Sequence, residues 1–565
     1  MKSLFSGSIE ERQIFPWREP ELGEVDALHV LLKNVGRLCG ERVDSGRIDR
    51  EAHIPDNVLH GFKELGCFGL LVPRAYGGAG LSNTGYGRVI QEIAGFDASI
   101  AVTLGAHQSL GLRGLLLFGT EAQKARYLPR LAAGELIAAF ALSELGAGSD
   151  PAAIQTHAER QEDGSYVVTG SKAWITNGGL ADVFTVFART SPTEDGTKPR
   201  ITAFVIERGA GVSSGPNQPK LGIRGSSTTE VLFDHVRVPF ENVLGGVGRG
   251  YRVATDVLDG GRLGLASGCL GLARRAIQMS VERCRARRAF GDPIGEFGII
   301  KDKIASMIAD TWALESVTYL TTGMVDTGAR DFAVESATCK VVASETCWRV
   351  VNEALQIAAS AGYMADHPYE RLLRDARVNL IFEGTNEILR ANIALSGMRG
   401  PGRALADVAR ATRRPIPGIG LLRDVAVRRA KSAFGRDRMT QHHPALQRQA
   451  LIFEEYVHAL SRGADKALRR HGTDIAEMQY TQKRAADIAI DLYAIAACVT
   501  RATRAIERRG EEGAKRELDF TTIFVSSAQR RLAENVAAIE KNDDELRKAV
   551  ASRAYADGGY SPDVL

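Results

Sequence analysis

The segment Ile381–Arg390, IFEGTNEILR, places one carboxylate in unusual surroundings at the end of a run that reads as helical. Glu383 lies between the apolar pair Ile381–Phe382 and the pair Gly384–Thr385. An unpaired ionised carboxylate is costly to bury, and burial raises the pKa of a carboxyl group, which makes it a better base near neutral pH. The alternative is a Glu in a Gly-Thr turn at a helix N-terminus, where backbone amides satisfy it. Taken alone, the decapeptide favours this alternative.

The pattern around this segment predicts an α+β protein with the order helical, β, helical. Strand-like runs occur only in the middle third and do not alternate with helices, which argues against a doubly wound sheet. We expect these runs to form an antiparallel β-domain; they are Tyr166–Thr169, Val183–Ala188, Ile201–Ile206 and Glu230–Val238. The predicted parts are an N-terminal helical domain (1–137), a middle antiparallel β-domain (138–247), a C-terminal helical bundle with Glu383 (248–398), a basic linker (399–440) and an additional C-terminal helical domain (441–565).

Composition sets limits on the class of protein. A chain of 565 residues, 44% hydrophobic and 25% charged, is an ordinary globular protein of several domains. A net charge of +4 gives no argument for nucleic acid. The seven cysteines show no metal-ligand spacing and fit buried positions in a reducing compartment. The N-terminal residues lack the apolar region of a signal peptide, and no apolar run reaches transmembrane length, so we expect a cytoplasmic location and no metal site.

Two segments allow two interpretations each. Thr103–Gly111, TLGAHQSLG, is helical and rich in small residues, which could leave a channel inside a bundle or serve close helix packing. Between Arg399 and Arg438 there are eleven Lys or Arg and three Asp, and a short helix is expected at Leu421–Phe434. This segment could attach peripherally to an anionic membrane through Arg423, Arg428 and Arg429, or be a solvated linker.

Four short motifs offer chemistry, although each has a structural alternative. Phe140–Asp150, FALSELGAGSD, is a loop with free amides and hydroxyls that suits a flavin edge or a pyrophosphate; surface loops share this composition. Trp174–Gly179 places an aromatic plane and a hydroxyl at a strand end, or else forms a hairpin with a core Trp. Asp259–Arg262 and Arg287–Gly291 bring cations near helix ends, where they could meet phosphates or be solvated.

Taken together, the motifs resemble the acyl-CoA dehydrogenase family from about residue 60 to residue 396. They occur in the family's order and spacing, and the small-residue stretch and the C-terminal extension are most similar to the very-long-chain branch. The sequences that carry the resemblance are FALSELGAGSD, WITNGG, STTEVLFDHVRVP, RRAFG, ERLLRDAR and IFEGTNEILR.

The resemblance implies an FAD held between the three domains. The residues implied in cofactor binding are Phe140, Leu142, Ser143, Gly148, Ser149, Trp174, Ile175, Thr176, Arg287, Phe290, Gln356, Gly362, Thr385 and Glu387, with Arg287, Phe290, Gln356 and Gly362 on the ADP half of an FAD shared across a subunit interface. Ser149, Asp259, Arg262 and Gly384 are implied in binding the acyl-CoA. One departure is that Gln356-Ile357 is followed by Ala358-Ala359, where the family commonly has Gly-Gly.

The resemblance also implies the reaction. Glu383 matches the family's base, whereas the position that carries the base in a sister branch is Gly261 here. Glu383 would remove the α-proton of a long-chain fatty acyl-CoA while the β-hydrogen leaves as hydride to flavin N5, giving a trans-2-enoyl-CoA in the first step of β-oxidation. Electrons would pass to an electron-transfer flavoprotein, and the protein would be a homodimer. The alternatives are an acyl-CoA oxidase and a scaffold or assembly protein on the same fold.

Overall fold

The computed structural model describes residues 1–190, 200–413 and 437–561. The chain divides into two compact units, Pro16–Leu389 and a second unit that combines Met1–Phe15 with Arg390–Leu565. All seven cysteines are buried and unpaired, as the composition predicted. In the described part of the chain, no helix combines the length and apolarity needed to cross a membrane.

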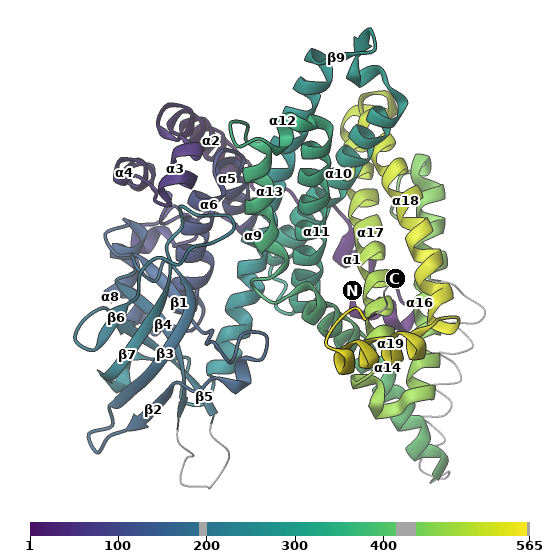
Figure 1. Cartoon of the computed structure of the whole chain (residues 1–565). Coiled ribbons are helices and arrows are strands. Elements are labelled where there is room, and N and C mark those ends of the chain that lie inside the picture. The colour runs from purple at the N-terminus through teal and green to yellow at the C-terminus, as the bar shows by residue number, and fades with distance from the viewer. Residues whose placement is uncertain (191–199, 414–436, 562–565) are drawn as a thin grey trace. The chain divides into compact units, whose positions relative to one another are not determined.

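The first part of the Pro16–Leu389 unit is helical (Figure 1). Its helices are α2 (Leu22–Arg42), α3 (Ser45–Glu51), α4 (Asp56–Glu64), α5 (Asn83–Phe96), α6 (Ala98–Gly105), the π-helix η3 (Ala106–Gly111), α7 (Arg113–Phe118) and α8 (Glu121–Ala132). Side-chain caps define several starts: Ser82 caps α5, Asp97 caps α6, and Thr120 with Gln123 forms a capping box at α8. The predicted helical stretch at Thr103–Gly111 is therefore confirmed, with its second half in the wider π geometry.

The middle part is one eight-stranded sheet in the order β6-β7-β3-β2-β4-β5-β8, with β1 beside β4. Its strands are β1 (Ala138–Ala141), β2 (His157–Arg160), β3 (Tyr166–Thr176), β4 (Val183–Thr190), β5 (Arg200–Glu207), β6 (Val212–Ser214), β7 (Thr228–Val238) and β8 (Val243–Leu244). All four predicted strands are present, and β3 is longer than expected.

The sheet is mainly antiparallel, as predicted, but two pairings are parallel. Both β1 and β2 run parallel to β4. Strand β4 is almost wholly buried, which is typical of a strand with neighbours on both sides. The sequence pattern could not reveal these pairings, because they join segments whose order in the sheet differs from their order in the chain.

Long helices form the third part of this unit: α9 (Gly250–Ala286), α10 (Gly298–Asp326), α11 (Ala333–Ala358), α12 (Ser360–Tyr363) and α13 (Tyr369–Arg377), with a small hairpin, β9 (Arg288–Ala289) and β10 (Asp292–Pro293), between α9 and α10. Helix α9 packs against both α5 and α11. It thus links the N-terminal helices to the C-terminal bundle, and its glycines allow close approach to α5, since a Cβ atom at Gly271 would lie 2.2 Å from Gln91 O.

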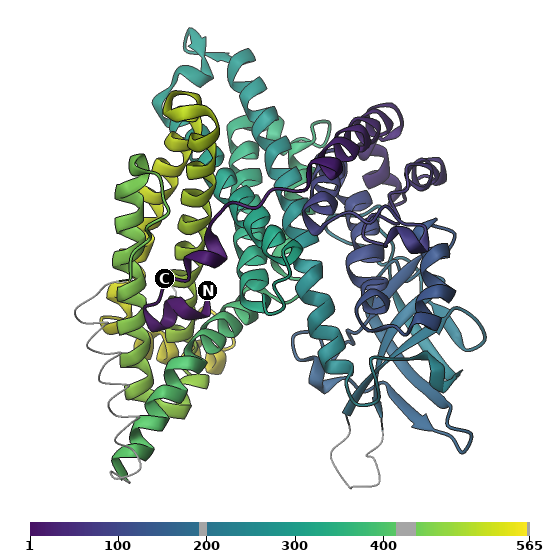
Figure 2. The ribbon, with the colours of Figure 1, turned by 180° about the vertical axis from the view of Figure 1, so that it is seen from behind.

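The second unit holds η1 (Lys2–Ser6), α1 (Glu11–Ile14), most of α14 (Asn386–Arg413), α16 (Gln447–His471), α17 (Gln479–Gly513), α18 (Lys515–Glu540) and α19 (Asp544–Asp557). Figure 2 shows the N-terminal residues beside these helices, and Ser8 Oγ donates to Asp437 Oδ2 over 2.8 Å. Partly buried ion pairs tie the helices together, including Arg484–Asp544 and Arg531–Asp491, each at 2.6 Å.

The predicted basic linker needs one correction. Helix α14 continues to Arg413, so residues 399–413 are helical, and Pro401 lies inside the helix. The predicted helix at Leu421–Phe434, with Arg423, Arg428 and Arg429, lies outside the described residues. The linker was predicted from the excess of basic residues and from Pro415 and Pro417, which lie outside the described residues, so only its first part, up to Arg413, is shown to be helical.

Candidate active site

Glu383 occupies a tight turn between the short helix η7 (Val378–Leu380) and α14. Its φ is 56°, and the φ of Gly384 is 93°. A non-glycine residue in the left-handed region is strained and persists only where its surroundings fix it. Arg262 of α9 provides one such contact, because its Nε donates to the Glu383 carbonyl oxygen over 3.1 Å. The turn is therefore held in a conformation that an isolated chain would avoid.

The Glu383 carboxylate lacks the backbone amide partners of the alternative interpretation. Its Oε2 atom is fully enclosed and has no hydrogen-bond partner among the described residues. Burial raises the pKa of Glu383 to about 7, although the charges of Arg262 and Lys340 act in the opposite direction. A carboxyl group with a pKa near neutrality can accept a proton at working pH.

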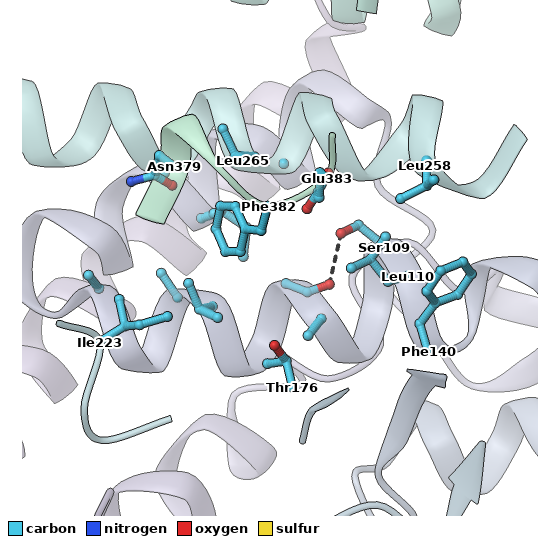
Figure 3. Close-up of a pocket in the computed structure, with 18 of the residues that line it drawn as sticks. Ser109, Leu110, Phe140, Thr176, Ile223, Leu258, Leu265, Asn379, Phe382 and Glu383 are labelled. Carbon is cyan, nitrogen blue, oxygen red and sulfur yellow. Dashed lines mark hydrogen bonds between the residues drawn. The ribbon is translucent and has the colours of Figure 1, made fainter. Parts of the chain in front are cut away.

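Glu383 opens on a cavity between the N-terminal helices, the sheet and α9 (Figure 3). One wall comes from α6 and η3, where Gly105 and Ala106 line the cavity, as the channel interpretation of Thr103–Gly111 predicted. The close-packing interpretation also holds at one end of the stretch, because a Cβ atom at Gly111 would lie 2.7 Å from the Ala138 backbone. The opposite wall comes from α9 and the turn after α13, including Phe382. The remaining lining residues include Ile90, Ala94, Ala98, Ala101, Val102, Gly105, Ala106, Ser109, Leu110, Ile223, Leu258, Gly264, Leu265, Gly268, Leu272, Asp375 and Asn379.

The predicted flavin loop and strand end reach the same cavity. Its lining includes Phe140, Leu142, Ser143 and Gly148 from the loop after β1, and Trp174, Ile175 and Thr176 from the end of β3. Because β3 pairs with β7 here, the hairpin alternative for Trp174–Gly179 is wrong. Trp174 has a φ of 57° and is 52% exposed, so it is not a core residue. A strained, half-exposed aromatic residue is typical of a ligand site.

The other predicted site residues lie at different distances from the cavity. Gly384 lines it, Ser149 follows Gly148 at the exposed rim, and Thr385 and Glu387 continue into α14. Asp259 pairs with Arg262 at 2.7 Å behind the Glu383 turn, where neither residue lines the cavity. Arg287, Phe290 and Gln356 are exposed and do not line it, and Gly362 is buried beside Leu355.

Ala359, one of the residues that replaces the family's usual Gly-Gly, has φ 55° and ψ −132°. This backbone conformation suits glycine and strains alanine. We expect Ala359→Gly to stabilise the protein by about 1 kcal/mol or more, seen as a higher Tm. An unchanged or lower Tm would show that the neighbouring contacts of Ala359 offset the strain.

Gly261 lies directly against the Glu383 carboxylate. A Cβ atom at this position would be 2.8 Å from Glu383 Oε2 and 2.6 Å from Leu110 Cδ2. We expect Gly261→Ala to displace the carboxylate and to reduce turnover about 100-fold, since a shift of about 1 Å can have that effect. Single-turnover flavin bleaching measures the rate. The control is Gly40→Ala in α2, where no atom lies within 4 Å of the added methyl group; equal losses in both variants would contradict the steric argument.

Two buried residues of the site were missed by sequence reasoning. Lys340 of α11 donates from Nζ to the Gly384 carbonyl oxygen over 2.9 Å. Asn177 donates from Nδ2 to Thr103 O over 2.9 Å, and so ties the end of β3 to α6. A lysine inside the apolar run Ala337–Val341 is a signal that could have been noticed. The contact of Asn177 is long-range and has no such signal.

The order of the domains and this cavity define a helical–β–helical protein with a buried carboxylate opposite a loop suited to a flavin. Four family profiles match the chain. They are acyl-CoA dehydrogenase N-terminal domain (26–135), middle domain (139–236) and C-terminal domain (248–398), and ACAD9/ACADV C-terminal domain (444–559). The chain belongs to the acyl-CoA dehydrogenase family.

Individual relatives agree with this assignment. The chain is 40% identical over 549 residues to the mitochondrial very long-chain specific acyl-CoA dehydrogenase of Homo sapiens, covering 95% of this chain and 84% of that protein. An acyl-CoA dehydrogenase of Bacillus anthracis, solved in complex with FAD, matches with TM-score 0.81 and 30% identity over 97% of this chain and 94% of that chain. Butyryl-CoA dehydrogenase of Megasphaera elsdenii matches with TM-score 0.64 and 36% identity, over 66% of this chain and 98% of that one.

Proposed function

We propose that the protein dehydrogenates long-chain fatty acyl-CoA to trans-2-enoyl-CoA, the first step of β-oxidation. The observation that carries this proposal is the Glu383 carboxylate, whose enclosed, unpartnered Oε2 belongs to a residue lining the same cavity as the flavin-loop residues. Glu383 removes the α-proton of the thioester as general base. Its backbone N–H helps to polarise the thioester carbonyl, which makes that proton more acidic.

The residues present fit an FAD. The cavity combines a glycine-containing loop, a strained Trp and a hydroxyl, and these would hold the flavin through Phe140, Leu142, Ser143, Trp174 and Thr176. The bound flavin supplies the acceptor for the β-hydrogen as hydride. The walls of α6 and α9 exclude water, which strengthens electrostatic effects at Glu383. Arg287, Phe290, Gln356 and Gly362 would meet the ADP half of a partner subunit's FAD, which fits the exposure of the first three.

The cavity supports a long acyl chain. Gly268 lies seven residues after Gly261 on α9, which places it about 10 Å further along the helix from the base. Both Gly268 and Leu272 line the cavity. We expect Gly268→Leu to lower kcat/KM for C16 and C18 acyl-CoA at least about tenfold, and to leave C4 and C6 substrates nearly unaffected. Equal losses for all chain lengths would show that the distal cavity does not hold the acyl chain.

The test of the function is anaerobic bleaching of the flavin absorbance by acyl-CoA from C4 to C20. Rapid bleaching by the longer chains supports the proposal, and a yellow protein that no acyl-CoA reduces contradicts it. Rapid reoxidation of the reduced enzyme by oxygen would favour the acyl-CoA oxidase alternative. A protein that does not bind FAD would favour the scaffold alternative.

We infer further that an electron-transfer flavoprotein accepts the electrons and that the protein is a homodimer with a cytoplasmic location. The shared FAD site requires a second copy of the chain, and the exposed Phe290 and Gln356 fit such an interface. Peripheral contact of residues 399–440 with an anionic membrane stays a prediction from their charge.

A further inference from the structure

Lys340 lies on α11 and is an unusual lysine because its side chain is completely buried. A buried ammonium group is costly unless hydrogen bonds compensate for lost hydration. Its Nζ donates to Gly384 O over 2.9 Å and to Asn386 Oδ1 over 2.8 Å. Burial lowers the pKa of Lys340 to about 8, while the Glu383 carboxylate acts in the opposite direction. The group therefore remains mostly protonated at neutral pH.

The two acceptors of Lys340 belong to the turn that carries the base. Gly384 directly follows Glu383, and Asn386 begins α14. Asn386 is fixed in turn by Ser344, since its Nδ2 donates to Ser344 Oγ over 3.0 Å. Arg262 holds the preceding carbonyl oxygen, that of Glu383, from the opposite helix. Arg262 of α9 and Lys340 of α11 thus donate hydrogen bonds to the consecutive carbonyl groups of Glu383 and Gly384. The backbone of this turn is strained at Glu383.

The hydrogen bonds from Lys340 and Arg262 to the turn should determine where the Glu383 carboxylate lies. Glu383 Oε2 has no hydrogen bond of its own among the described residues, so its position depends on the backbone. Gly261 leaves the space that the carboxylate occupies. Releasing one carbonyl group would let the turn relax from φ 56° toward unstrained conformations, and the carboxylate would move with it.

We propose that Lys340 is a positioning residue for Glu383: Lys340 holds the 383–386 turn so that the Glu383 carboxylate faces the cavity. This inference rests on the proposed function of Glu383 as the base. The charge of Lys340 also favours the carboxylate form of Glu383, together with Arg262. The other titratable groups near this turn include Tyr86 and Arg113 on the N-terminal side, Asp259 and Cys269 on α9, Glu335 and Glu345 on α11, and Glu387 on α14.

The experiment compares Lys340→Met and Lys340→Arg with Lys303→Met, which removes a less buried lysine from α10. We expect Lys340→Met to lower kcat about 100-fold with little change in KM, and to move the acid limb of the kcat/KM profile to higher pH. Lys340→Arg should restore the pH profile more fully than kcat, because it keeps the charge but not the geometry. Unchanged kcat and pH profile in a folded Lys340→Met variant would overturn the proposal.

Two additions keep the test decisive. If Lys340→Met does not fold, Asn386→Ala removes one of the two acceptors and should reduce kcat about tenfold; normal kcat in that variant would count against positioning. Infrared difference titration of the Glu383 carboxyl, identified against Glu383→Gln, needs no turnover. If both the pKa of Glu383 and kcat are the same with and without Lys340, the inference is overturned, whereas a wild type that no acyl-CoA reduces overturns only the proposed function.

Discussion

Glu383→Gln is expected to slow flavin reduction by long-chain acyl-CoA about 10²- to 10⁴-fold, the range that a positioned general base contributes. Gln is nearly isosteric with Glu but cannot accept the α-proton, so FAD and acyl-CoA should still bind. Stopped-flow bleaching under anaerobic conditions measures the rate, and ligand-induced shifts of the flavin spectrum confirm binding. The control is Glu162→Gln, an exposed residue in the turn after β2. Retention of more than a tenth of the wild-type rate in Glu383→Gln would exclude Glu383 as the base.

The pH dependence of the wild type should report the same group. Burial raises the pKa of Glu383 to about 7 from an ordinary 4.5, and only the ionised form is a base. The value of kcat/KM should therefore rise with pH through about 7 and level off above it.

The contribution of Glu383 to the free energy of unfolding should fall as pH rises, whereas kcat/KM rises. The folded state binds the Glu383 proton more tightly than the unfolded state, so this group's contribution to stability falls as pH rises from 4.5 to about 7. Glu383→Gln removes that penalty, and its Tm should exceed that of the wild type above pH 7 and approach it at acid pH. Equal Tm values at pH 8 would show that the burial of Glu383 is not costly.

The parts of the candidate site that consist of residues adjacent in the chain could be predicted from the sequence. Glu383 beside Gly384, the flavin loop after β1 and the end of β3 were all visible as short motifs, and the structure brings them to one cavity. Contacts between distant segments were not visible. Lys340 meets Gly384 across 44 residues, and Met1–Phe15 joins Arg390–Leu565 in one compact unit. Such contacts depend on how helices pack, which hydrophobic periodicity does not encode.

The flavin loop has its own buried ion pair, and breaking it should have the largest effect on stability. Lys172 is fully buried on β3, and its Nζ donates to Glu144 Oε1 over 2.8 Å and to Leu142 O over 3.1 Å. Burial by itself would raise the pKa of Glu144, but the hydrogen bonds of Lys172 and Thr156 hold it below its ordinary value. The pair thus connects the loop that faces the cavity to the sheet beneath it.

Lys172→Met should destabilise the protein by about 3–5 kcal/mol, because it leaves the Glu144 carboxylate buried without its counter-charge. We expect a fall in Tm of about 4–6 °C together with weaker retention of FAD, measured by thermal unfolding and by the flavin absorbance after gel filtration. The double variant Lys172→Met/Glu144→Gln removes both charges and should recover part of the Tm. The control Arg47→Met breaks an exposed pair with Glu51 and should change stability by less than about 1 kcal/mol. If the double variant is no more stable than Lys172→Met, the uncompensated carboxylate is not the cause, and the lost contact with Leu142 O carries the effect instead.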